Sequence, residues 1–504
     1  MIETIQQAVK SHDKYQIEIK LDYEVLDDKE THYRIATYFF IPQSLDISAK
    51  TYSKQQFYSD VKNYIRLKTP ILNLHDLIDY EQSPLCQIEQ IVALHDWAHR
   101  EEIHQQLITN FKLSSAILKS SIREHFSLID ERIDESVPGS KIHLNIENLV
   151  ASYLTDTAVI SKRYRQLYAV FNMPNVDTAV FTAYTLTDES ISILIEEGLV
   201  EMFQIVQTYL KKETQQHFLD ELNHRAKEEI KYRRSRGYAS ILLEGSDNET
   251  YTYHVSVLKK YAASVLYLST AVRRDGWGLE QLLFALAAGF SMIFATLVAF
   301  YSQYRFGNLT FPFFIALVLA YMLKDRIKEL GRYLFASQMQ TRFYDRRINI
   351  RTLDGKHKLG VLREKMSFVQ EEDVPKPVLK IRNRDLFSDL DNDGLGETII
   401  CYTKDIVLYR KAFDRVYANT AQITGLNDII RYDIRPFLRK MAEPVQERPY
   451  LKDGQLCVAE CQKVYHINLV SRYRALQPQK EKFHRRLRLI LNQDGLKRIE
   501  YNPQ

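Results

Sequence analysis

Two long uncharged stretches interrupt an otherwise mixed pattern of hydrophobic and polar positions. Residues 282–301 read LLFALAAGFSMIFATLVAFY, and residues 307–323 read GNLTFPFFIALVLAYML. A bilayer core about 30 Å thick needs roughly 20 apolar residues at 1.5 Å rise per residue. Two helices buried in a soluble core would usually keep a polar stripe. We therefore expect a two-helix transmembrane hairpin over residues 279–324, with its turn at residues 302–306.

Basic residues lie on both outer flanks of this predicted hairpin, whereas its turn carries only Arg305. The flanking residues are Lys259, Lys260, Arg273 and Arg274 before the first span, and Lys324, Arg326, Lys328 and Arg332 after the second. Positive flanks stay on the cytosolic side of a membrane. The charges predict a multi-pass protein of the inner (plasma) membrane with both termini in the cytosol.

The region before the hairpin, residues 1–278, is expected to be a mainly helical cytosolic domain. Residues 15–23 and 33–41 are rich in β-branched and aromatic residues around an acidic turn, which predicts a β-hairpin near the start. From Lys54 onward, apolar residues recur at spacings of three and four, which is typical of amphipathic helices. The predicted helices cover residues 85–107, 144–171, 191–210 and 214–234.

After the hairpin we expect a helical connector over residues 325–345 and then an α+β cytosolic domain over residues 346–504. The second domain is strand-rich, with one helix expected at residues 428–441. The predicted strands cover residues 378–382, 398–402, 406–410, 456–464 and 465–473. Asp494-Gly495, between two alternating runs, predicts a terminal β-hairpin. The predicted fold class is thus an integral membrane protein with a mainly α N-terminal arm and an α+β C-terminal arm.

Composition narrows the class further. The chain has 504 residues, of which 45% are hydrophobic and 26% charged, so several folded domains are expected. A net charge of +4 is too small to indicate a nucleic-acid-binding protein. Four cysteines are too few for a disulfide scaffold, and no apolar signal sequence begins the chain. Both observations predict cytosolic arms.

One acidic loop has the spacing of a cation site. Residues 389–397 read DLDNDGLGE, which places carboxylates at Asp389, Asp391, Asp393 and Glu397. Alternating carboxylates followed by glycine match short calcium-binding loops, although position twelve of an EF-hand would be Ile400. The loop is a candidate site for Ca²⁺ or another divalent cation, and the alternative is a solvated turn that binds nothing.

A histidine cluster is the only catalytic candidate. His95 and His99 stand one helical turn apart, and Asp96 follows His95. Together with His75, the His95-Asp96 pair resembles the metal-dependent HD phosphohydrolases over a few residues. That resemblance implies a divalent metal and a later aspartate, for which Asp130 and Asp156 are available. The alternative is a set of polar residues on a solvated helix face.

The sequence shows no Gly-rich nucleotide loop, serine-hydrolase elbow, zincin or kinase motif. Arg342, Arg346 and Arg347 follow the predicted hairpin closely, so anionic lipid headgroups are their expected partners. We therefore expect a membrane-anchored, cytosol-facing interaction or regulatory protein, with a protein partner or a second copy of the chain. The alternatives are a membrane-tethered metal-dependent hydrolase that uses the histidine cluster and a small oligomeric channel.

Overall fold

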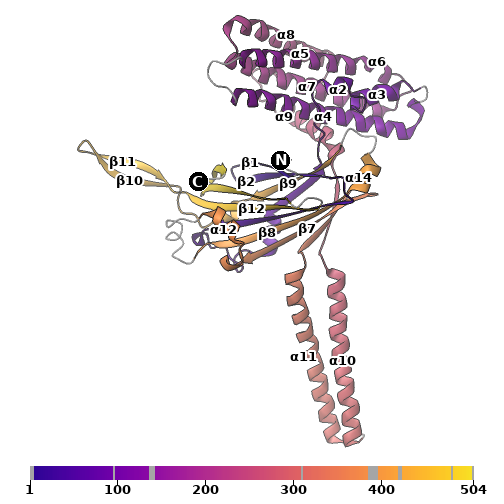
Figure 1. Cartoon of the computed structure of the whole chain (residues 1–504), viewed down its shortest axis with the longest axis vertical. Coiled ribbons are helices and arrows are strands. Elements are labelled where there is room, and N and C mark those ends of the chain that lie inside the picture. The colour runs from indigo at the N-terminus through magenta and orange to yellow at the C-terminus, as the bar shows by residue number, and fades with distance from the viewer. Residues whose placement is uncertain are drawn as a thin grey trace. The chain divides into compact units, whose positions relative to one another are not determined.

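A computed structural model describes residues 5–94, 97–134, 142–307, 310–383, 396–417, 423–477 and 481–501 (Figure 1). The chain divides into two compact units, each assembled from separate segments. The sheet unit comprises Met1–Ile65, Ser269–Ala412 and Asn427–Gln504, and the helical unit comprises Arg66–Leu268 and Phe413–Leu426.

The sheet unit is built on an eight-stranded antiparallel sheet with the order β14-β13-β12-β3-β8-β7-β6-β5. Its strands are β3 (Glu30–Ile41), β5 (Ser269–Arg273), β6 (Arg346–Arg351), β7 (Lys358–Val369), β8 (Thr398–Tyr409), β12 (Tyr465–Gln477), β13 (Glu481–Asn492) and β14 (Gly495–Tyr501). Strands near the two ends of the chain are therefore neighbours, because β3 pairs with both β8 and β12.

A four-stranded sheet with the order β1-β2-β9-β4 covers one face of the larger sheet. Its strands are β1 (Ile5–Asp13), β2 (Gln16–Glu24), β4 (Val61–Leu67) and β9 (Gly425–Asp433). Alternate residues of each strand point into the space between the sheets. Aromatic rings meet there, with Phe39 of β3 against Tyr432 of β9 at 5.4 Å and Tyr23 of β2 against Tyr33 of β3 at 5.5 Å. The core of this unit thus lies between two sheets.

Short elements complete the sheet unit. Val378 of α12 packs on the opposite face of the large sheet, against Tyr38 and Phe40. Strands β10 and β11 form a separate two-stranded ribbon, and the predicted terminal hairpin is present as β13 and β14. The bounds of these elements are α1 (Lys54–Asp60), α12 (Lys376–Arg382), α15 (Arg435–Leu438), β10 (Val445–Lys452) and β11 (Gln455–Gln462). Helix α14 (Arg410–Tyr417) begins in the sheet unit and ends in the helical unit.

The helical unit is a bundle around buried aromatic residues. The rings of Tyr164 and Tyr184 stack with centroids 4.9 Å apart, and Phe111 meets both rings edge-on. Its helices are α2 (Asp76–Asp79), α3 (Pro84–Val92), α4 (Glu101–Asp134), α5 (Ile142–Gln166), α6 (Tyr168–Phe171), α7 (Thr178–Tyr209), α8 (Lys212–Arg236) and α9 (Glu249–Ala263). Aromatic packing of this kind adds specific edge and stacking contacts to apolar burial.

Two long helices, α10 (Trp277–Phe306) and α11 (Phe311–Arg342), leave the sheet unit between β5 and β6 and pack antiparallel as an arm (Figure 1). Their alignment follows from two contacts. A Cβ atom on Gly331 would lie 3.0 Å from the Cβ of Ala287, and one on Gly276 would lie 2.8 Å from the Phe343 ring. The helical arm is therefore about as long as α10 itself, roughly 45 Å at 1.5 Å per residue.

The predicted two-helix transmembrane hairpin is wrong. Among the described residues, only α10 is long and apolar enough, by length and composition, to cross a membrane. Helix α11 begins at Phe311, not at Gly307, and its uncharged part ends at Leu323, just before Lys324. These thirteen residues measure roughly 20 Å as a helix, whereas a bilayer core is about 30 Å thick.

The predicted mainly helical N-terminal arm and separate α+β C-terminal arm are also corrected. The fold is mixed α/β, with large sheets. Strands β1, β2 and β3 of the N-terminal region join sheets to which residues 346–501 contribute most of the other strands, the exceptions being β4 and β5. The local patterns indicated strands near both ends of the chain, but pairing between distant segments cannot be seen in a local pattern.

Candidate anion-binding pocket

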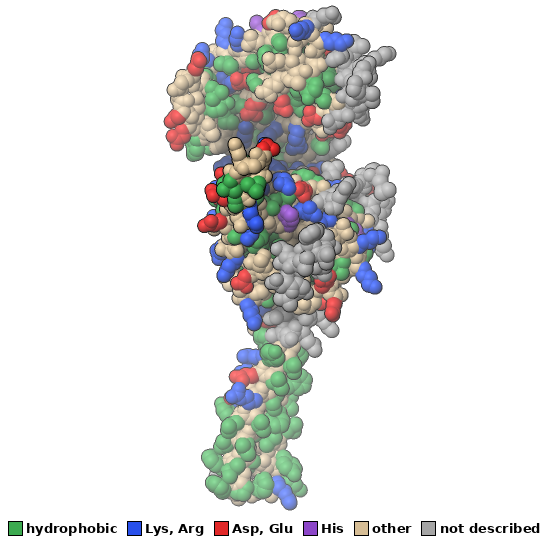
Figure 2. Space-filling model, turned by 90° about the vertical axis from the view of Figure 1, so that its left-hand side faces the viewer, with side chains coloured by type: hydrophobic (Ala, Val, Ile, Leu, Met, Phe, Trp, Pro, Cys, Tyr) green, Lys and Arg blue, Asp and Glu red, His purple; other side chains and the backbone are tan. Residues whose placement is uncertain are grey.

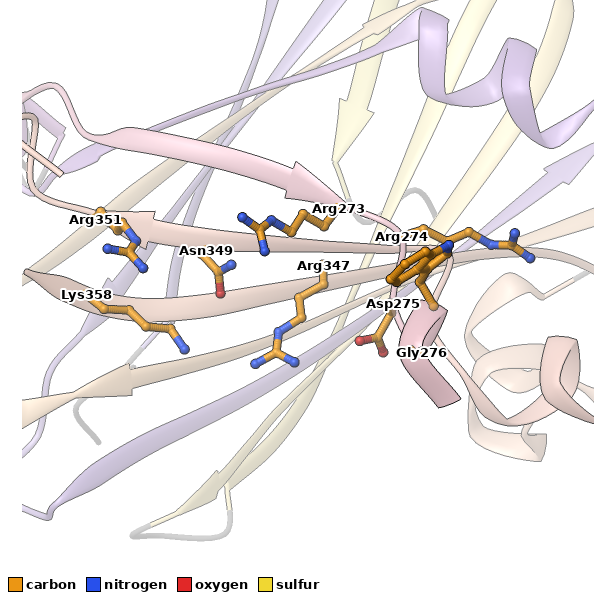
Figure 3. Close-up of a pocket in the computed structure, with 10 residues that line it drawn as sticks. Arg273, Arg274, Asp275, Gly276, Arg347, Asn349, Arg351 and Lys358 are labelled. Carbon is orange, nitrogen blue, oxygen red and sulfur yellow. The ribbon is translucent and has the colours of Figure 1, made fainter. Parts of the chain in front are cut away.

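A cavity of about 760 Å³ lies in the sheet unit where β5 leads into α10 (Figure 3). Strands β5, β6 and β7 and the first residues of α10 form its wall. The lining residues are Arg273, Arg274, Asp275, Gly276, Trp277, Gly278, Arg347, Asn349, Arg351 and Lys358. Five of these ten residues are Arg or Lys and one is acidic, so the cavity is strongly basic.

Cations face one another across neighbouring strands in this basic pocket. Arg273 of β5 is paired with Arg347 of β6, and Arg351 of β6 is paired with Lys358 of β7. Arg347, Asn349 and Arg351 share one face of β6, because alternate residues of a strand point the same way. Like charges directly opposite each other in antiparallel strands are destabilising. The pocket therefore costs stability unless an anion neutralises it.

The protein itself supplies few counter-charges to these side chains. Arg274 Nη2 lies 3.1 Å from Glu280 Oε1, and Arg351 Nη1 donates to the carbonyl oxygen of Gly355 at 2.9 Å. Within the described part of the chain, the side chains of Arg273 and Arg347 form no hydrogen bond or ion pair, and the Nε atom of Arg347 is buried. Arg273 and Arg347 are thus able to bind an anionic ligand.

The crowding of charge is visible in Lys358. Its pKa is lowered, because burial disfavours the charged amine and because Arg347, Arg351 and Arg363 repel another positive charge. An anion bound among these groups would counteract the repulsion. Protonation of Lys358 and anion binding therefore favour each other.

The start of α10 adds backbone donors to the basic pocket. Gly276 precedes the helix with a φ of +71°, and the Phe343 ring leaves no room there for a side chain. None of the side chains that the structure describes caps this helix end. The first N–H groups of a helix lack intrahelical partners and carry partial positive charge. Glu280 in the first turn is already held by Arg274, so the exposed N–H groups reinforce the positive potential.

Outside the basic pocket, a carboxylate follows the arginines in the same cross-strand row of the sheet. Arg363 of β7 is paired with both Arg347 and Asp405. Asp405 accepts a hydrogen bond from Arg34 Nη2 at 2.7 Å, and its Oδ1 lies 2.9 Å from His32 Nε2. Burial would raise the pKa of Asp405, but the contacts with His32 and Arg34 lower it to about 2. The charge on β8 and β3 is therefore balanced internally.

Asp405→Asn is expected to reduce the free energy of unfolding by about 1–2 kcal/mol at pH 7, allowing for partial screening of the partners. Because the folded-state pKa lies below the ordinary value of 3.8, this stabilisation is present above pH 4 and is lost as the pH falls toward 2. Hydrogen exchange of the β3 and β8 amides at pH 7 and pH 3 measures it. The difference between wild type and variant should shrink at pH 3, and a difference independent of pH would contradict the electrostatic cause.

The predicted cation loop lies mostly outside the described residues, which include Glu397 but not Asp389, Asp391 or Asp393. The Glu397 side chain is 4% exposed and accepts two hydrogen bonds from Arg382 of α12, at 2.7 and 3.0 Å. That carboxylate is already neutralised by a guanidinium group. Binding of Ca²⁺ or another divalent cation to this loop stays a prediction.

The predicted histidine cluster is only partly described. His95 and Asp96 lie outside the described residues, and His99 ends a short 3-10 helix whose first residue is Trp97. His75 is exposed and lies 3.4 Å from both Asp79 and Asp156. No group of three or more metal-ligating side chains occurs among the residues that the structure places. The hydrolase interpretation therefore stays a prediction.

The three arginines predicted to contact lipid lie in different surroundings. Arg347 lines the basic pocket, whereas Arg346 stacks on the ring of Tyr58 with its guanidinium carbon 4.1 Å from the ring centre. Arg342 ends α11. Sequence reasoning missed Arg273, Arg351 and Lys358 as pocket residues. The alternation Arg347-x-Asn349-x-Arg351, read with a period of two, is the signal that indicates one basic strand face.

Searches with protein-family models and of curated proteins find no match to this chain. Its function is therefore inferred from the helical arm and the basic pocket.

Proposed function

We propose that this protein is a membrane-attached interaction or regulatory protein whose helical arm inserts its apolar distal part into a lipid bilayer. The observation that carries this proposal is the exposure of large apolar side chains around the arm (Figure 2). Leu297 is 63% exposed, Phe300 66% and Phe311 75%. Monomeric soluble proteins rarely expose contiguous apolar patches larger than a few hundred Å².

The distribution of charge on α11 supports insertion from one side. At the alignment set by Ala287 and Gly331, Lys324 lies level with roughly residue 294 of α10. Beyond that level, both helices are uncharged and largely apolar over roughly 20 Å, except for Arg305 and the polar Ser302 and Gln303 near the turn. Nearer the sheet unit, α11 carries Lys324, Asp325, Arg326, Lys328 and Glu329. We therefore propose that only the distal part of the arm, beyond Lys324, enters the bilayer.

Lys324, Arg326 and Lys328 are the basic residues at the sheet-unit end of the apolar part, so we assign the contact with anionic headgroups to them. The chain enters and leaves the arm from the paired strands β5 and β6, which supports placing both termini on one side. Basic flanks and four free cysteines among the described residues favour the cytosolic face of the inner (plasma) membrane. Headgroup contact by Arg342, Arg346 and Arg347 stays a prediction.

Flotation of the purified full chain with lipid vesicles, after removal of detergent, tests this proposal. The protein is expected to float with neutral vesicles and to resist a wash in 1 M salt, because burial of apolar surface is insensitive to charge screening. Anionic lipid should increase the floated fraction at low salt. A protein that remains in the dense fraction as a soluble monomer or oligomer would contradict membrane attachment.

A further inference from the structure

We infer that the basic pocket binds a small phosphate-bearing anion from the aqueous phase, held between the Arg273–Arg347 and Arg351–Lys358 pairs. The supporting features are the cavity, the two directly opposed cation pairs and the uncapped start of α10. Phosphate binding does not depend on membrane attachment, whereas the assignment to a soluble ligand rests on the proposed insertion depth of the arm.

The donor set selects phosphate over other anions. Guanidinium groups present paired N–H donors that match the oxygen spacing of phosphate, and free N–H groups at a helix N-terminus bind phosphate oxygens. Asn349 lies between the two cation pairs and adds a neutral amide. A single carboxylate would leave most of these donors without a partner.

The spacing of the pairs indicates more than one phosphate group. Arg347 and Arg351 are four residues apart on β6, which corresponds to roughly 13 Å along a strand. Long Arg and Lys side chains shorten that gap by reaching toward each other (Figure 3). A pyrophosphate, an oligophosphate or a doubly phosphorylated small molecule can contact both pairs at once, whereas orthophosphate can contact one.

The distance along α10 favours a soluble ligand over a lipid headgroup. Trp277 lines the basic pocket, and Lys324 lies level with roughly residue 294, which is seventeen residues further along α10. That separation is about 25 Å at 1.5 Å per residue. If the membrane surface lies near Lys324, headgroups remain well below the pocket.

Titration calorimetry of the full chain with sodium pyrophosphate, tripolyphosphate, orthophosphate and sulfate, at matched ionic strength, tests this inference. Saturable binding is expected, at least tenfold tighter for pyrophosphate or tripolyphosphate than for orthophosphate or sulfate. Arg347→Gln and Lys358→Gln should each weaken pyrophosphate binding at least tenfold. Without ligand, Arg347→Gln should raise the melting temperature slightly, because it removes a like-charge pair.

Arg346→Gln is the matched control, because it removes the same charge from the adjacent residue, whose side chain stacks on Tyr58 outside the pocket. It should leave pyrophosphate binding unchanged. Equal loss of binding in Arg346→Gln and Arg347→Gln would show nonspecific attraction and overturn the inference. The absence of saturable binding would overturn it as well. Binding seen only with vesicles that carry phosphomonoester headgroups would assign the pocket to lipid and overturn the soluble-ligand inference.

Discussion

Leu297→Asp is expected to release the protein from lipid vesicles. Leu297 lies on α10 within the part of the arm that is apolar on both helices, and its side chain is 63% exposed. Leu297 lies about 5 Å beyond the level of Lys324, at about 1.5 Å per residue. Aspartate there costs less than the roughly 3 kcal/mol of the bilayer centre, and a roughly tenfold weaker partition is expected. Flotation over a range of lipid concentrations measures this change directly.

Leu242→Asp provides the matched control. Leu242 lies in the helical unit and is 61% exposed, so the same substitution at nearly equal exposure should leave flotation unchanged. Equal partition of wild type and Leu297→Asp would show that the arm is not in the lipid. Release by both variants would point to a general loss of folding, which far-ultraviolet circular dichroism detects.

The sequence predicted the location of the arm but not its relation to a bilayer. The uncharged run from Leu282 to Tyr301 is a property of consecutive residues, so hydropathy alone reveals it. The prediction of a second transmembrane helix was wrong because of where α11 begins and which part of α10 lies beside Lys324. Both are consequences of helix packing, which a window of apolar residues does not contain.

The predicted secondary structure was wrong in two segments whose local pattern is compatible with both a helix and a strand. Residues 428–441 were expected to form a helix, but Asp428–Asp433 belongs to β9 and only Arg435–Leu438 is helical. Residues 378–382 were expected to form a strand, but they belong to α12, where Pro377 suits the first turn of a helix. In both cases tertiary contacts decide between short runs of similar hydrophobicity.

The basic pocket was harder to predict than either element. Arg273 and Arg347 are separated by the whole helical arm, and only the pairing of β5 with β6 places them opposite each other. Counting charges along the sequence reveals basic residues before and after the arm, but it does not show that they meet in one pocket. The register of the strands is the missing information.

Strand register also brings together a buried cluster of charges in the core of the sheet unit. Lys404 of β8 lies between the carboxylates of Asp428 and Glu364, with Nζ–O distances of 2.5 and 3.7 Å. All three side chains are at most 2% exposed. Tyr402 donates to Glu364 at 2.6 Å, and burial together with that carboxylate raises the pKa of Tyr402 well above its usual value. Its hydroxyl therefore stays protonated and keeps donating.

Lys404→Met is expected to destabilise the sheet unit by about 3–5 kcal/mol, because it leaves two carboxylates buried without a cation. Methionine keeps much of the side-chain length, so a cavity contributes little. Hydrogen exchange of the β7 and β8 amides measures the effect in this unit, since urea unfolding of a two-unit chain need not be two-state. Lys356→Met, at an exposed position in the turn before β7, is the control and should change exchange little.

Combining Lys404→Met with Glu364→Gln and Asp428→Asn should recover part of the lost stability, because removing the unpaired charges relieves the main penalty. That recovery separates electrostatics from packing. A triple variant less stable than Lys404→Met would show that the two carboxylates stabilise the core through their other hydrogen bonds, including the one from Tyr402. A loss below about 1 kcal/mol in Lys404→Met itself would contradict the burial of this charge cluster.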